Sequence, residues 1–195
     1  MIGRVFCAVV LIAAAASSIQ AEPFHHPFGE WREYNRDWLA VCPDEIDEDA
    51  VDYYGISCFA STGSNEKNAA GLPAYKLTVF RNRLNGDLDI AITVAADDVA
   101  IDQTRPIELA MTGETPANFD FINDLETRYD TANQFFIRDP LREEALLEAM
   151  RDSEAVTLSV PLIDVVPAKD VALSLRGVAA SIDFMATYAR RVAQY

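Results

Sequence analysis

Two cysteines and the acidic segment between them are the residues whose types could do chemistry in this sequence. Cys42 ends one β-rich run, Trp38–Cys42, and Cys58 begins another, Cys58–Ser61. The loop between them carries six carboxylates: Asp44, Glu45, Asp47, Glu48, Asp49 and Asp52. A cysteine pair can form a disulfide, bind a metal or supply a nucleophilic thiolate. Clustered carboxylates can hold a divalent cation or act as acid and base in hydrolysis.

The cysteine pair is best interpreted as a disulfide. Zinc would need further ligands, and His25 and His26 are the only histidines in the chain. The spacing matches no zinc module, and two adjacent histidines do not readily form a preorganised ligand pair. We therefore predict a Cys42–Cys58 disulfide, worth roughly 3 kcal/mol for a loop of this length. Zinc binding and a reactive thiol are the alternatives.

The acidic loop offers weak candidates for a divalent-cation site, namely Asp44, Asp47, Asp49 and Asp52. It lacks the glycine and the regularly spaced ligands of the helix–loop–helix calcium motif. Runs of like charge usually stay hydrated on a protein surface. We expect a solvated acidic loop, with no cofactor and no metal.

Catalytic motifs are missing from the sequence. It contains no Gly-x-Ser-x-Gly elbow, no phosphate-binding Gly-x-x-x-x-Gly-Lys loop and no His-Glu-x-x-His helix. A Ser-His-Asp triad would depend on His25 or His26, which lie near the start of the chain. We assign no catalytic residues and favour a non-enzymatic protein. A carboxylate-based hydrolase or a divalent-cation-binding protein using residues 44–52 is the alternative.

Residues 1–21 have the parts of a secretory signal peptide. Arg4 precedes the apolar run Val5–Ala16, and small residues lead to Ala21, after which we expect cleavage. The run is too short to span a bilayer, which takes about 20 apolar residues. Cys7 lies inside the run, so Cys42 and Cys58 are the two cysteines of the mature chain. An even number of cysteines in an oxidising compartment favours a disulfide, so that prediction depends on export. We predict a periplasmic or secreted bacterial protein.

The net charge of the chain limits the classes of partner that we expect it to bind. The formal net charge is −15, and removing Arg4 with the signal peptide makes it −16. Such a surface repels phosphate backbones and anionic lipid, which disfavours nucleic-acid and membrane-surface binding. We expect no membrane span after cleavage and an unidentified protein or envelope component as partner.

The mature chain is predicted to be mainly β. We predict that residues 22–37 form an N-terminal arm and that residues 38–195 form a single domain. Tyr75–Arg81 and Leu88–Val94 flank Asn85-Gly86, a pair typical of β-hairpin turns. Further strands are predicted at Ala100–Asp102, Pro106–Thr112, Asn133–Arg138, Ala155–Ile163 and Lys169–Arg176. Two half-apolar sheets of this kind pack face to face in a sandwich.

Two helices are predicted late in the chain. Pro140–Asp152 has strong helix formers, with Asp139 as the cap. Helical spacing places Leu141, Ala145, Leu146 and Met150 on its apolar stripe and Arg142, Glu143, Glu144, Glu148 and Arg151 toward water. After Gly177, the range 178–192 has apolar residues at helical spacing, namely Val178, Ile182, Met185, Ala189 and Val192.

Several of these segments together resemble the invasion-associated locus B family of exported bacterial proteins. The similarity starts with Asp37-Trp-Leu-Ala-Val-Cys42 and Cys58-Phe-Ala-Ser61 and continues in Ala95–Asp102. It extends through the helix Leu141–Arg151 to Val171-Ala-Leu-Ser-Leu-Arg-Gly-Val-Ala-Ala180. The order and spacing match from about Trp38 to Tyr188.

The resemblance has two departures. Family members commonly carry a second, central cysteine pair, which the range Asn118–Gln134 lacks, and Val178 replaces the family's phenylalanine. The chain therefore resembles a divergent member. The resemblance implies an immunoglobulin-like β-sandwich in a periplasmic or secreted protein, linked in some members to host-cell invasion. It supplies no catalytic residues.

Overall fold

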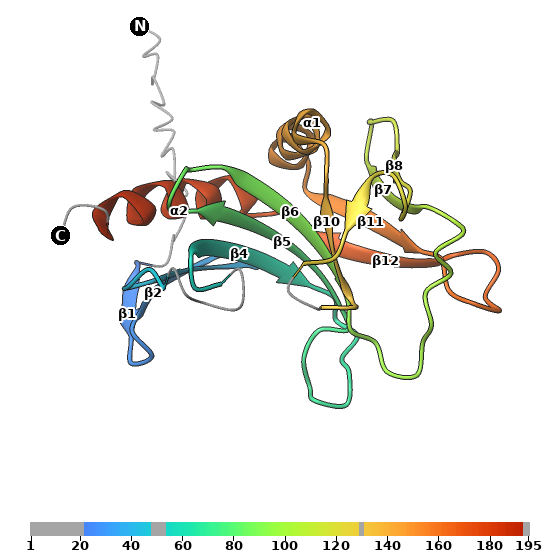
Figure 1. Cartoon of the computed structure of the whole chain (residues 1–195), viewed down its shortest axis with the longest axis horizontal. Coiled ribbons are helices and arrows are strands. Elements are labelled where there is room, and N and C mark those ends of the chain that lie inside the picture. Colours follow the sequence, from blue (N-terminus) through green and yellow to red (C-terminus); the bar gives the residue numbers. More distant parts are fainter. Residues whose placement is uncertain (1–21, 48–53, 129–130, 193–195) are drawn as a thin grey trace, which may run out of the picture.

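The computed structural model describes residues 22–47, 54–128 and 131–192, which form two antiparallel sheets and two helices (Figure 1). In chain order the elements are β1 (Phe24–His26), β2 (Glu30–Asn35), β3 (Trp38–Pro43), β4 (Ser57–Gly63), β5 (Tyr75–Asn82), β6 (Leu88–Val94), β7 (Ile107–Met111), β8 (Ala117–Phe119), β9 (Leu125–Glu126), β10 (Gln134–Ile137), α1 (Pro140–Asp152), β11 (Ala155–Val160), β12 (Lys169–Ser174) and α2 (Val178–Val192). The mainly β, sandwich-like fold with two late helices is confirmed.

The larger sheet is mostly a meander. Its order is β1-β2-β3-β4-β5-β6-β10-β9, so the first six strands pair with their sequence neighbours. Residues 22–37, for which we expected an arm, supply β1 and β2 as an antiparallel hairpin at the edge of this sheet. The predicted β5–β6 hairpin is confirmed, although its connection is longer than a two-residue turn, and Gly86 adopts the positive φ of 86°.

The smaller sheet has the order β12-β11-β7-β8. Buried and more exposed side chains alternate along each of its strands. Leu158 pairs with Leu109 on one neighbouring strand and with Val171 on the other. All three side chains are buried. Period-two alternation thus gives this sheet one apolar face, which needs a cover.

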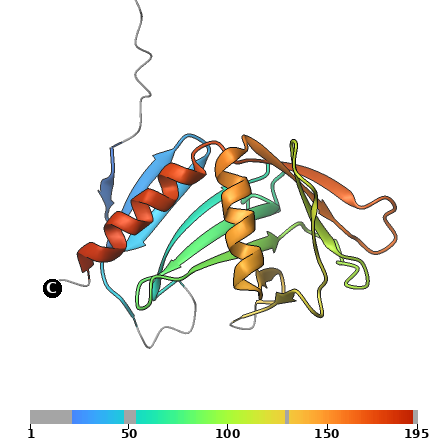
Figure 2. The same cartoon turned by 90° about the horizontal axis from the view of Figure 1, so that it is seen from above.

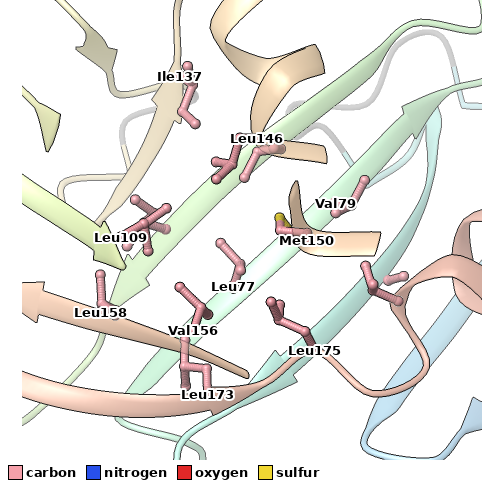
Figure 3. Close-up of a cluster of buried hydrophobic side chains, with 14 of the residues drawn as sticks. Leu77, Val79, Leu109, Ile137, Leu146, Met150, Val156, Leu158, Leu173 and Leu175 are labelled. Carbon is pink, nitrogen blue, oxygen red and sulfur yellow. The ribbon is translucent and has the colours of Figure 1, made fainter. Parts of the chain in front are cut away.

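Three elements share the inner face of the large sheet. Helix α2 contacts β2 to β5, helix α1 contacts β6 and β10, and β12 brings the small sheet against β4 and β5. Figure 2 shows both helices on the same side of the large sheet, α1 crossing the β5–β6 hairpin. The core between these layers includes Leu77, Leu146, Met150, Val156 and Leu173 (Figure 3).

The outer face of the large sheet carries an aromatic row formed by Tyr54, Phe59, Phe80 and Phe136. The ring centroid of Tyr54 lies 4.7 Å from that of Phe59 and 5.2 Å from that of Phe80. The Phe80 centroid in turn lies 5.5 Å from that of Phe136. Phe80 and Phe136 are fully buried, and Tyr54 comes from the loop that follows β3. The end of the acidic loop is therefore packed on the sheet. Offset and edge-to-face ring contacts of this kind stabilise beyond their buried area.

The predicted disulfide between Cys42 and Cys58 is confirmed. The two residues lie opposite each other one position beyond the Val41–Phe59 pair of β3 and β4, with their Cα atoms 4.2 Å apart. Both belong to the core. Because both sulfurs are bonded to each other, neither is available as a zinc ligand or as a nucleophile.

Trp38 and Gly177 join the start of the chain to its end. The buried Trp38 indole donates a hydrogen bond from Nε1 to the carbonyl of Ser174 over 2.9 Å. Gly177 has a φ of +104°, and a Cβ there would lie 1.8 Å from the carbonyl oxygen of Asn35. Asp37 accepts hydrogen bonds from Ser174 Oγ and from the Arg176 guanidinium. A side chain at position 177 would push these segments apart.

The close approach at Gly177 gives a stability prediction. We expect Gly177→Ala to lower the free energy of unfolding by about 3 kcal/mol or more, because backbone strain and a backbone clash add. Gly113→Ala is the matched control: Gly113 has a φ of +85° and nothing within 4 Å of the added Cβ. Strain alone there costs about 1 kcal/mol. Equal losses in urea denaturation would contradict the clash.

Candidate functional site: an acidic groove beside helix α1

The acidic loop chosen from the sequence is partly anchored. Asp44 Oδ2 lies 2.6 Å from His25 Nε2, and the Asp47 amide donates to the carbonyl of Gly55. Asp49 and Asp52 lie outside the described residues. Within the described part of the chain, no three His, Cys, Asp or Glu side chains are arranged to hold a metal ion. The solvated loop stays a prediction, and a cation site at residues 44–52 stays its alternative.

Arg83 fixes the first part of this loop. Its Nη1 donates to the carbonyl oxygens of Pro43, at 2.6 Å, and Glu45, at 3.1 Å. The side chain is buried, and burial lowers the pKa of the guanidinium, although nearby Asp44 acts in the opposite direction. Arg83 thus anchors the backbone at the start of the loop, and its guanidinium group is buried away from solvent.

A second group of carboxylates lies between α1 and the β5–β6 hairpin. A groove of about 700 Å³ opens there, which we call the acidic groove. Its carboxylates are Asp87 and Asp89 from the hairpin and Glu143, Glu144 and Glu148 from α1. Leu88 and Leu147 supply apolar wall, and Arg151 lies at the α1 end of the lining.

Helix α1 forms over the predicted residues, with Asp139 as its cap. The Asp139 side chain accepts a hydrogen bond from the Leu141 amide, and Pro140 occupies the first turn. The helix therefore begins at the predicted residue, but the face that it turns toward the sheet differs from the prediction.

The predicted apolar stripe of α1 is partly wrong. Leu141 is 76% exposed and Ala145 is exposed, whereas Glu143, predicted to face water, is only 6% exposed. The buried positions 143, 146, 147 and 150 follow helical spacing, so the true stripe contains a carboxylate. Glu143 is the candidate site residue that sequence reasoning missed; the signal was its place four residues before Leu147 and seven before Met150.

A backbone amide explains why a carboxylate occupies this stripe. The ladder between β6 and β10 ends at the Ala91–Phe136 pair. The next amide of β6, that of Ile90, donates to Glu143 Oε1 over 2.7 Å. A buried amide without a partner would cost about 1–3 kcal/mol. Glu143 therefore continues the hydrogen bonding of β6 where the neighbouring strand leaves off.

Burial raises the pKa of the Glu143 carboxyl group toward neutral pH. Desolvation is the main cause and raises the pKa from its ordinary 4.5 to about 7. The Ile90 amide opposes this shift; Asp89 and Glu126 add to it, and Arg128 opposes it. Near neutral pH the carboxyl group is thus close to half protonated.

Arg128 pairs with carboxylates on the hairpin side of the groove. Its Nη1 lies 3.0 Å from Asp89 Oδ1, its Nε lies 2.6 Å from Glu126 Oε1, and its guanidinium covers the Phe136 ring. Asp89 is therefore paired, and its partner also closes the aromatic row. Glu144 and Glu148 are exposed and make no ion pair with described residues.

The groove has the chemistry of a site for a positively charged ligand. Its carboxylates attract a cation, and Leu88 and Leu147 can contact methylene groups that carry it. Glu144 and Glu148 lie one helical turn apart, which separates their Cβ atoms by about 5–6 Å. This spreads the negative charge along the groove.

Comparison with known protein families, with curated proteins and with solved structures finds no match to this chain.

Within the described residues, neither helix combines the length and the apolar character needed to cross a membrane.

The raised pKa of Glu143 gives a pH prediction. The unfolded carboxyl loses its proton near pH 4.5 and the folded one near 7, so the folded state is favoured at low pH and loses this advantage as pH rises through that window. Relative to Glu143→Gln, we expect the wild-type chain to lose about 2 kcal/mol of unfolding free energy between pH 4.5 and 7.5, after allowance for solvent at the open side of the groove.

Urea denaturation at several pH values measures this difference, in which the other titrating groups cancel. The exposed neighbour Glu144→Gln is the matched control and should give a difference from wild type that barely changes with pH. A Glu143→Gln profile parallel to wild type would show that Glu143 ionises normally.

Proposed function

We propose that this chain is an exported, non-enzymatic binding module of the invasion-associated locus B type, and that the acidic groove binds a cationic group of its partner. The observation that carries the binding proposal is Glu143, a carboxyl group 94% buried at a groove rich in carboxylates. Folded proteins rarely bury such a group unless it is paired or serves a site.

Export is supported by two features of different kinds. The first 21 residues have signal-peptide composition, and Cys42 and Cys58 form a disulfide. Disulfides persist mainly in oxidising compartments such as the periplasm and the cell exterior. The sandwich-like fold is compatible with the family resemblance, which rests on the ordered segments from Trp38 to Tyr188.

A carboxylate-based enzyme is the second candidate, and one observation favours it. A carboxyl group with a pKa of about 7 is suited to accept or donate a proton at neutral pH. Asp89, an acidic neighbour that raises the pKa of Glu143, is already paired with Arg128. We rank this function below binding.

Expression of the full chain in a bacterium with a functional secretion pathway tests export. We expect the periplasmic fraction to contain a protein that lacks residues 1–21 and whose Cys42 and Cys58 resist alkylation until a reductant is added. Intact mass spectrometry reads both properties at once. A full-length product retained in the cytoplasm with three alkylated thiols, Cys7 included, would refute export.

Isothermal titration at low salt tests the groove, with tetralysine, 1,6-diaminohexane and hexamethonium as probes. We expect the Glu144→Gln/Glu148→Gln variant to bind the preferred probe at least about tenfold more weakly, since removing two nearby charges weakens attraction by roughly 1.4 kcal/mol or more. Glu114→Gln/Glu154→Gln removes two exposed carboxylates outside the groove lining and is the matched control.

If none of the three probes binds, or if both double variants weaken binding equally, the groove is not the site. Calcium serves as an additional probe. Calcium binding that is lost on Asp44→Asn and Asp47→Asn would favour the divalent-cation alternative at the loop.

A further inference from the structure

The free oxygen of Glu143 indicates what kind of cation the acidic groove accepts. Oε1 is occupied by the Ile90 amide, whereas Oε2 accepts no hydrogen bond from any described residue. The side chain is more than nine-tenths buried and still lines the groove. A ligand carrying N–H donors would satisfy Oε2, and a charge-assisted hydrogen bond is the strongest available form of that contact.

The distribution of the other carboxylates favours a linear ligand over a point charge. They come from two walls, Asp87 and Asp89 on the hairpin and Glu144 and Glu148 on α1, and each wall also contributes a leucine to the lining, Leu88 and Leu147. No three of the chain's described acidic, histidine or cysteine side chains converge as metal ligands. A methylene chain with terminal ammonium groups matches apolar walls flanked by separated negative charges.

The charges around Glu143 favour its protonated form while the groove is empty of ligand. On the sheet side, Asp89 of β6 and Glu126 of β9 outnumber Arg128, which bonds both. Within the groove lining, Asp87, Glu144 and Glu148 outnumber Arg151. Added negative charge at Glu143 is therefore opposed from both sides, and burial opposes it further. An ammonium ion placed at Oε2 reverses this balance.

We propose that the acidic groove takes a linear ligand with a primary ammonium group, either a free polyamine or a lysine side chain, and that Glu143 releases its proton to solvent as the ammonium binds. The inference rests on the cation-binding function proposed above. In the exchange the carboxyl O–H bond breaks, the proton goes to water or buffer, and Oε2 accepts a hydrogen bond from the ammonium. The ligand stays protonated, so one positive charge replaces another at Glu143.

Titration calorimetry of the mature chain in two buffers of different ionisation enthalpy measures the protons released. With 1,6-diaminohexane we expect close to one proton per ligand at about pH 6 and almost none at about pH 8.5, because Glu143 is already ionised there. Glu143→Gln should release none at either pH. Glu114→Gln, which removes an exposed carboxylate outside the groove lining, should behave like wild type.

Two ligand comparisons complete the test. Hexamethonium has the same chain with quaternary ends that lack N–H donors, so it should bind more weakly and release fewer protons. Tetralysine and spermidine separate the two sources of ammonium: preference for tetralysine indicates a protein partner and preference for spermidine a free polyamine.

The outcomes separate the two proposals. Diamine binding at pH 6 without proton release, or equal release with hexamethonium, overturns the role of Glu143 and leaves cation binding intact. Absence of binding by every cation overturns the proposed function itself.

Discussion

The inner face of the large sheet imposes the constraint on which the rest of this structure depends. Eight strands present more apolar surface than any one element covers, so α2, α1 and the small sheet lie on it side by side. Helix α1 covers the place where the β6–β10 ladder ends and the Ile90 amide needs an acceptor. A carboxylate at position 143 satisfies that amide. The core and the candidate site therefore share one side chain.

The position of Glu143 sets two electrostatic effects against each other. The Ile90 amide favours the charged carboxylate, whereas burial and the neighbouring Asp89 and Glu126 favour the neutral acid. Arg128 moderates the second effect and also covers the outer face through Phe136. Removal of Arg128 would thus act on both faces of the sheet. Such buried carboxyl groups are retained at a cost in stability, which is typical of functional sites.

Local patterns predicted much of this fold and little of the site. Strand alternation, Asp139-Pro140 and the export-dependent cysteine argument gave the β5–β6 hairpin, helix α1 and the Cys42–Cys58 disulfide. The short strands β8 and β9 escaped detection because each pairs over only two or three residues. Glu143 was assigned to the wrong face because helical periodicity treats a charge as solvent-facing. Its burial depends on Ile90, more than fifty residues away, and no local pattern contains that information.

The Gly177 junction has a consequence for the order in which the chain folds. Trp38 and Asn35 lie in the first strands, yet their contacts at Ser174, Gly177 and Ser181 are made by the last part of the sequence. Contacts between such distant residues slow folding, since a long loop must close before they form. In a nascent chain that still lacks β12 and α2, the indole of Trp38 has no acceptor at Ser174 and strands β2 to β5 lack the helix that covers them. The meander is built from local pairings, but its core is completed only when the final segment arrives, and until then its apolar inner face stays uncovered.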